Sequence, residues 1–84
     1  MTLSLSQANT GDHLTVVTID ASQPEVSERL FALGIFPGVL VQLLHRAPLG
    51  DPLQVKAGHT LVSLRKREAD TVTVELSLTT QEAS

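Results

Sequence analysis

Residues 22–38, with the sequence SQPEVSERLFALGIFPG, are the stretch of the chain that decides its fold. Their first residues have the pattern of a capping box, in which the Ser22 hydroxyl accepts a helical N–H and the Glu25 side chain accepts the cap N–H. Apolar residues then recur at positions i, i+4 and i+7, as one helical face requires: Val26, Leu30 and Leu33. Gly34 suits a left-handed cap, and a proline follows soon after it. The stretch predicts one short helix, at about residues 24–33.

Strand-like segments lie on both sides of this helix. They are short, rich in β-branched residues and mostly alternating in polarity: 13–20, 39–45, 53–56, 60–66 and 72–76. In the first strand, alternation puts Leu14 and Val16 on one face, and Val17 and Ile19 on the other. In the second strand, Val41 and Leu43 are expected to point inward, and in the fourth strand Val62 and Leu64 are expected to share one face. The sequence predicts a mainly β protein with five strands and one inserted helix, arranged as a small, strongly bent barrel or a partly open sheet.

The connecting segments carry turn signals. Residues 4–12 are expected to form an irregular or helical turn that packs Leu3 and Leu5 on the barrel. Residues 57–59 suit a hairpin connection, and residues 67–70 suit one helical turn. Within this single domain of residues 1–84, an ordered core is expected at about residues 3–76, followed by a polar, flexible tail at 77–84.

Composition limits the classes of function. The 84 residues carry a net charge of −3 and 42% hydrophobic residues, as in an ordinary globular domain. There is no cysteine, which excludes disulfides and thiolate metal sites. Residues 1–10 do not have the pattern of a signal peptide, and the apolar run 39–44 is too short to span a bilayer. These features predict a cytoplasmic protein that is not embedded in a membrane.

Aromatic residues are scarce, since the chain has two phenylalanines and neither tryptophan nor tyrosine. Grooves for proline-rich peptides and platforms for single-stranded nucleic acid are both built of aromatic rings. The acidic net charge also disfavours binding to duplex DNA. No nucleotide-binding motif and no nucleophile–base arrangement is legible, so we predict a non-enzymatic protein with no cofactor and no nucleic-acid partner.

Two segments of the chain together resemble a known family. Residues 29–38, RLFALGIFPG, resemble the R-L-x-x-L-G-hydrophobic-x-P-G signature of FeoA domains. Residues 47–52, APLGDP, are similar to the A-P-L-G-D-P loop of that family, and residues 63–69, SLRKREA, follow at the expected distance. The likeness covers nearly the whole chain. One departure is Phe36, at a position that the family usually fills with a smaller or polar residue.

The resemblance implies a fold, a function and a partner. FeoA proteins are small cytosolic accessory proteins of bacterial ferrous iron transport with an SH3-like barrel and an inserted helix. The implied partner is FeoB, a membrane permease with a cytosolic GTPase domain, which could place the protein peripherally at the inner membrane. Two alternatives stay open: a free-standing protein-binding module of the kind found in iron-dependent repressors, and a protein that binds ferrous or another transition-metal ion.

The helix and its exit supply the first candidate partner contact. Phe31, Ile35 and Phe36 lie off the apolar stripe of the helix. Phe31 is about 100° around the helix from Leu30 and is expected to be at least partly exposed. An exposed cluster of these three side chains has the character of an interaction site. The alternative is that Phe36 folds under the helix and Phe31 closes an open end of the barrel.

Two other segments supply further candidate contacts. Leu49 lies at the tip of the loop 47–52, which could contact a partner or serve only as a rigid connection. Arg65 and Arg67, in the run RKR at the end of a predicted strand, could contact an acidic partner surface or anionic lipid headgroups. The alternative for the run is a solvated edge that discourages pairing between sheets.

Metal binding rests on three separated histidines, His13, His45 and His59. None belongs to a closely spaced pair with another histidine, and Asp12 next to His13 faces the other way if both lie in a strand. Solvated histidines at strand ends are the simpler interpretation. The alternative is that they join carboxylates across two molecules, as in a metal-bridged homo-oligomer, with a preference for borderline ions.

Overall fold

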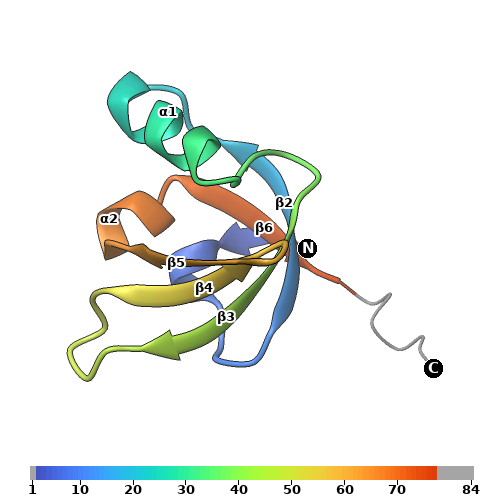
Figure 1. Cartoon of the computed structure of the whole chain (residues 1–84), viewed down its shortest axis with the longest axis vertical. Helices are drawn as coiled ribbons and strands as arrows, with labels where there is room; N and C mark the ends of the chain where they lie inside the picture. Colours follow the sequence, from blue (N-terminus) through green and yellow to red (C-terminus); the bar gives the residue numbers. More distant parts are fainter. Residues whose placement is uncertain (1, 78–84) are drawn as a thin grey trace.

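The computed structural model describes residues 2–77, which form one six-stranded antiparallel sheet with short helices (Figure 1). The elements in chain order are β1 (Thr2–Ser4), the 3-10 helix η1 (Leu5–Gln7), β2 (His13–Ile19), α1 (Pro24–Ala32), β3 (Leu40–Arg46), β4 (Leu53–Ala57), β5 (Thr60–Leu64), α2 (Lys66–Ala69) and β6 (Val72–Leu76). The mainly β class and the single inserted helix are confirmed. The tail expected at residues 77–84 lies outside the described residues except for Ser77.

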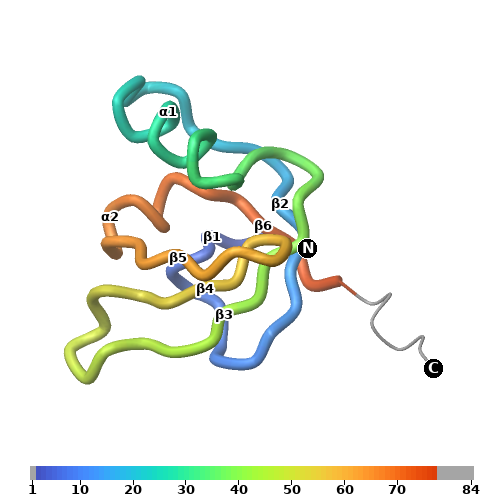
Figure 2. The backbone as a smooth tube through the Cα atoms, viewed as in Figure 1, coloured from blue at the N-terminus to red at the C-terminus, as the bar shows by residue number. Residues whose placement is uncertain are grey.

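The sheet has the strand order β1-β6-β2-β3-β4-β5. The prediction of five strands missed β1, which pairs with β6 so that the first and last strands lie side by side (Figure 2). A strand of three residues is too short for alternation to reveal it. The sheet bends around one core, but its edge strands β1 and β5 are not paired with each other, so the barrel is open.

The core lies inside the bend of the sheet. Each strand from β2 to β6 contributes residues to it, and Leu5 and Leu30 add to it from η1 and α1. The pairs predicted to share a strand face in β2, β3 and β5 are all buried: Leu14 and Val16, Val41 and Leu43, and Val62 and Leu64. The packing of Leu3 and Leu5 on the barrel is also confirmed.

The prediction that Ile19 shares a strand face with Val17 was wrong. The pairing of β2 with β6 shifts by one residue between Val16 and Thr18, which is a β-bulge. After the bulge, Ile19 pairs with the buried Val72 and packs against the core, whereas Val17 is exposed. A bulge inserts one extra residue, so the period-2 rule fails beyond it.

Helix α1 begins without the predicted capping box. Its N-cap is Gln23, and no side chain caps the first turn. Ser22 is used differently, because its N–H donates to Asp20 Oδ1 at 2.9 Å in a turn that precedes the helix. Hydrogen bonding by the backbone N–H of Ser22, and then by its side chain, lowers the pKa of the Asp20 carboxyl below its usual range. Pro24 occupies the first helical position, where the missing N–H costs little.

The end of α1 is fixed by a Schellman motif. The Ile35 N–H donates to the Leu30 carbonyl at 2.9 Å, and the Gly34 N–H donates to the Phe31 carbonyl at 3.0 Å. Gly34 has a φ of +91°, the left-handed conformation that this motif requires. The apolar contact that accompanies the motif joins Leu30 and Ile35, and both are fully buried. The predicted helix end at residue 33 is therefore correct to within one residue.

Replacing Gly34 by alanine is expected to lower the free energy of unfolding by about 1 kcal/mol. An added Cβ would meet no atom within 4 Å, so the whole effect comes from holding an L-residue at a left-handed φ. The measurement is urea unfolding followed by circular dichroism, with Ala32→Gly as the control for helix propensity. An unchanged midpoint for Gly34→Ala would contradict the assignment of this cap.

The second half of the chain is close to the prediction. Gly58 and His59 form a two-residue loop between β4 and β5, with Gly58 at a φ of +60°. Strand β5 ends at Leu64 rather than at the predicted residue 66, because α2 begins at Lys66. The Arg65 N–H donates to Glu68 Oε1 at 2.9 Å and thereby caps the first turn of α2.

Candidate interaction surfaces

Phe31 and Phe36 form an exposed aromatic pair at the end of α1. Their ring centroids are 5.2 Å apart with an interplanar angle of 44°, a favourable tilted arrangement. Phe31 is 67% exposed and Phe36 is 39% exposed. The expected exposure of Phe31 is confirmed, and Phe36 is not folded under the helix. The Schellman motif reverses the chain after α1 and so brings the two rings together.

The aromatic pair lines an open groove of about 390 Å³. The groove runs between α1 and the end of β2, and its other lining residues are Pro37, Ser27, Glu28, Thr18 and Ile19. Both rings present apolar surface to it, and Glu28 adds a carboxylate at the rim. Phe31, Phe36 and Pro37 are defined here as the apolar surface of the molecule. Aromatic side chains partly exposed beside a groove are typical of contact sites for proteins.

The prediction that Ile35 belongs to this exposed cluster was wrong. Ile35 is fully buried in the core. It follows the glycine of the Schellman motif, at the position whose side chain packs back against the last turn of the helix. The helical-wheel reasoning did not apply to Ile35 because the helix has already ended at Ala32.

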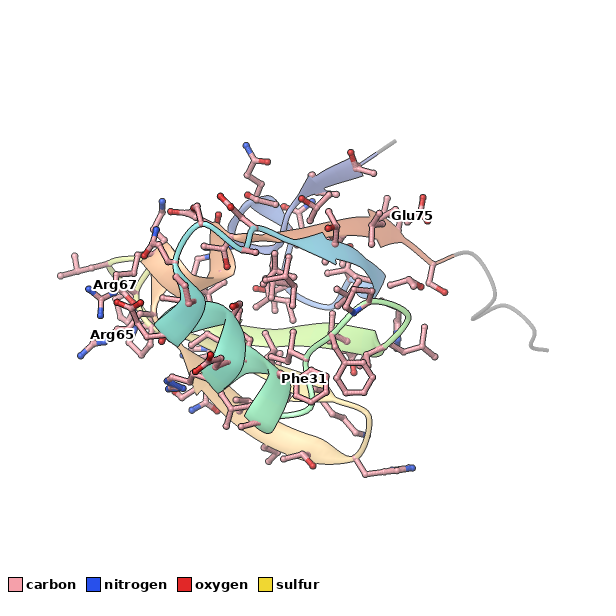
Figure 3. The ribbon with its side chains drawn as sticks, turned by 90° about the horizontal axis from the view of Figure 1, so that it is seen from above. Phe31, Arg65, Arg67 and Glu75 are labelled. Carbon is pink, nitrogen blue, oxygen red and sulfur yellow. The ribbon has the colours of Figure 1, made fainter. Side chains whose placement is uncertain are left out.

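Arg65 and Arg67 lie together on a different side of the molecule, well separated from Phe31 (Figure 3). The strand predicted to reach residue 66 ends at Leu64, so the run 65–67 does not lie in a strand. Arg65 Nη1 is 4.0 Å from Asp51 Oδ1, and Lys66 Nζ is 3.7 Å from Asp70 Oδ1. Within residues 2–77, Arg67 has no ion-pair partner. The structure therefore has separate apolar and basic surfaces.

Leu49 is 95% exposed at the tip of the β3–β4 loop, as expected. This loop lies away from α1, at the other side of the molecule in Figure 1. Asp51 ties the loop to the basic side, because Asp51 Oδ1 accepts the Lys66 N–H at 3.0 Å. Leu49 thus accompanies Arg65 and Arg67 and does not extend the apolar surface.

An ion pair between Arg29 and the buried carboxylate of Glu68 was not predicted. Arg29 Nε is 3.1 Å from Glu68 Oε2, and the Glu68 side chain is only 7% exposed. The other Glu68 oxygen caps α2 by accepting the Arg65 N–H. This carboxylate links two segments that carry the family likeness, because Arg29 begins residues 29–38 and Glu68 lies within residues 63–69. The only sign of this ion pair in the sequence was the charge of Arg29, directly before the apolar Leu30.

The three histidines are not brought together. His13 begins β2, His45 lies in β3, and His59 lies in the β4–β5 loop, all exposed. His13 Nε2 is 3.3 Å from Gln42 Nε2, a side-chain hydrogen bond between β2 and β3. In the part of the chain that the structure describes, no group of three His, Asp or Glu side chains is arranged to hold a metal ion.

The sequence matches the FeoA domain family over residues 3–76. The chain belongs to the FeoA family. The match includes both signature segments and every strand from β2 to β6. The FeoA protein of Chlorobium tepidum has a similar solution structure, with 36% identity and a TM-score of 0.81, covering 88% of this chain and 70% of that one.

A second FeoA structure describes the fold class directly. The FeoA protein of Stenotrophomonas maltophilia, solved in complex with zinc, is 29% identical with a TM-score of 0.76, covering 87% of this chain and 89% of that one. It is described as an SH3-domain protein and as a candidate activating factor of bacterial ferrous iron transport. The predicted SH3-like class is confirmed by this similarity and by the sheet of the present FeoA chain.

The same fold occurs in a larger regulatory protein. A manganese-dependent transcriptional repressor matches with a TM-score of 0.84 and 21% identity, covering 90% of this chain and 42% of that one. At this identity, the similarity concerns the fold alone. Among residues 2–77 of the FeoA chain, no helix has the length and apolar character needed to cross a bilayer.

Proposed function

We propose that this chain is a non-enzymatic accessory protein of bacterial ferrous iron uptake that binds the cytosolic part of a FeoB-type GTPase permease. The observation that carries the proposal is the family match over residues 3–76. The exposed Phe31–Phe36 pair beside a groove supports a role in binding another protein. The apolar surface is the primary docking site in this proposal, and Leu49, Arg65 and Arg67 form a second contact.

The apolar surface suits a partner contact for physical reasons. Phe31 contributes little to the stability of the folded domain, because two thirds of its surface is exposed to water. Burial of such rings at an interface releases about 25 cal/mol for each Å² of apolar area, and aromatic anchors dominate interface energetics. The pair is also held by a fixed helix end, so little freedom is lost when it binds.

Replacing Phe31 by aspartate is expected to weaken binding to the permease's cytosolic domain at least tenfold, because a carboxylate would be buried in an apolar contact. The measurement is calorimetric titration of the purified cytosolic domain, repeated with full-length permease in nanodiscs. Leu40→Asp is the matched control, since Leu40 is comparably exposed but lies on β3.

Three results would count against the proposal. Failure of the wild-type protein to bind either form of the permease would remove the proposed function. Equal weakening by Phe31→Asp and Leu40→Asp would mean that the apolar surface is not the docking site. A larger effect of Leu49→Asp would transfer the primary contact to the β3–β4 loop.

A further inference from the structure

Among the described residues 2–77, strand β5 forms an open edge of the sheet, because β4 is the one strand that pairs with it. The two-residue loop makes Ala57 and Thr60 a hydrogen-bonded pair, and hydrogen-bonded pairs then alternate along the two strands. Thr60, Val62 and Leu64 therefore bond to β4, while Leu61 and Ser63 direct their N–H and C=O groups outward. The other side of β4 agrees with this alternation. There the Gly58 N–H points away from β5 and donates to the Leu40 carbonyl at 3.1 Å.

The outward backbone groups of this edge have no hydrogen-bond partner in the described part of the chain. Within residues 2–77, no hydrogen bond outside the β4–β5 pairing uses the backbone of Leu61 or Ser63. Both residues are exposed, Leu61 by 67%. The edge ends at Arg65, whose N–H is already taken by Glu68 Oε1. A short row of two donors and two acceptors, bounded at both ends, matches an extended peptide of a few residues.

Cationic side chains lie at both ends of this edge. Lys56 lies directly opposite Leu61 and is exposed on the same face. At the other end, Ser63 and Leu64 line a cavity of about 330 Å³ together with Pro52, Arg29 and Arg65. The Arg29 charge is shared with Glu68, but Arg65 has only a 4.0 Å contact with Asp51, so it retains capacity for an anion. A segment lying along β5 would pass over this cavity.

We propose that the β5 edge binds an extended segment of a partner protein as an added strand, with an acidic side chain of that segment placed between Arg29 and Arg65. Backbone groups of Leu61 and Ser63 select the extended conformation, and the surrounding cations select the acidic side chain. A second copy of this chain would bring the same cations to the edge and is disfavoured. This site is separate from the apolar surface but shares Arg65 with the second permease contact proposed above. Its test uses peptides and does not depend on binding to a permease.

The test is an NMR titration of ¹⁵N-labelled protein with synthetic peptides. The probe is acetyl-Thr-Val-Glu-Val-Thr-Val-amide. In one control peptide the glutamate is replaced by lysine, and in the other the valine that follows the glutamate is replaced by proline. The glutamate peptide is expected to shift the amides of Leu61 and Ser63 saturably. The lysine peptide should bind about two- to fivefold more weakly, as the loss of one exposed ion pair predicts. The proline peptide should not shift these amides, because it lacks a donor in the strand.

Matched variants test the same site from the protein side. Ser63→Pro removes an outward N–H without breaking a bond to β4, and it should abolish the shifts. Arg65→Gln should weaken the glutamate peptide about two- to fivefold, and Lys66→Gln, which faces Asp70, should not. The proline peptide repeats the Ser63→Pro test with the unaltered protein, so misfolding of that variant cannot decide the result.

Three outcomes would overturn the proposal. The first is the absence of saturable shifts at Leu61 and Ser63 with the glutamate peptide. The second is equal binding of the glutamate and lysine peptides. The third is a concentration-dependent shift of these amides without any peptide, which would identify a second copy of the chain as the occupant.

Discussion

Replacing Ile35 by alanine is expected to lower the free energy of unfolding by about 2–4 kcal/mol. Ile35 is fully buried, and it supplies the apolar contact of the Schellman motif together with Leu30. Its truncation leaves a cavity and loosens the connection from α1 to β3. For a domain of this size, the loss corresponds to a fall in Tm of roughly 10–25 °C. The chain has no tryptophan or tyrosine, so unfolding is followed by far-ultraviolet circular dichroism.

Phe31→Ala is the matched control for this measurement. Phe31 is a larger side chain four residues earlier, but it is mostly exposed, so its truncation is expected to change stability by no more than about 0.5 kcal/mol. Similar losses for the two variants would contradict the division between a structural Ile35 and a surface Phe31. The pair of variants also separates stability from binding, since only Phe31→Ala should weaken a partner contact without unfolding the domain.

The buried carboxylate of Glu68 is expected to give the second large effect. Glu68→Ala should lower the free energy of unfolding by about 1–3 kcal/mol, because it removes the cap of α2 and the partner of Arg29. Arg29→Ala should cost a similar amount, since it leaves a carboxylate buried with one remaining hydrogen bond. The double variant should lose less than the sum by about 1 kcal/mol.

Arg65→Ala is the control for the ion pair. The hydrogen bonds between Arg65 and Glu68 use the Arg65 backbone: its N–H donates to Glu68 Oε1, and its carbonyl accepts the Glu68 N–H. Alanine keeps both backbone groups, so the expected change in stability is within about 0.5 kcal/mol. Additive losses in the Arg29–Glu68 cycle would contradict the assigned coupling. The cycle is measured by urea unfolding at one ionic strength, because the half-exposed Arg29 is partly screened by salt.

Much of the fold could be predicted because local rules and burial agree. Alternation identified the inward residues of β2 and β3, such as Leu14 and Leu43, and the stripe that includes Leu30 identified α1. The rules failed where a local irregularity intervened. The bulge after Val16 returned Ile19 to the core, and the first strand was too short to show a period.

The candidate site was only partly predictable for a related reason. The exposure of Phe31 follows from its angle around the helix, but its contact with Phe36 depends on how the chain reverses after Gly34. The role of Glu68 depends on a contact across 39 positions of sequence, which no local pattern contains. The position of Arg65 and Arg67 away from Phe31 likewise depends on where β5 ends, which is at Leu64.

The two ends of α1 differ in a way that bears on motion. The first turn has no side-chain cap, whereas the last turn is closed by two backbone hydrogen bonds and by the buried Leu30 and Ile35. Amide hydrogens should therefore exchange with solvent faster near Pro24 than near Gly34. Phe31 lies at the slowly exchanging end, so a partner would meet a ring that is already in place. Fraying at the start of the helix should therefore leave the proposed docking surface undisturbed.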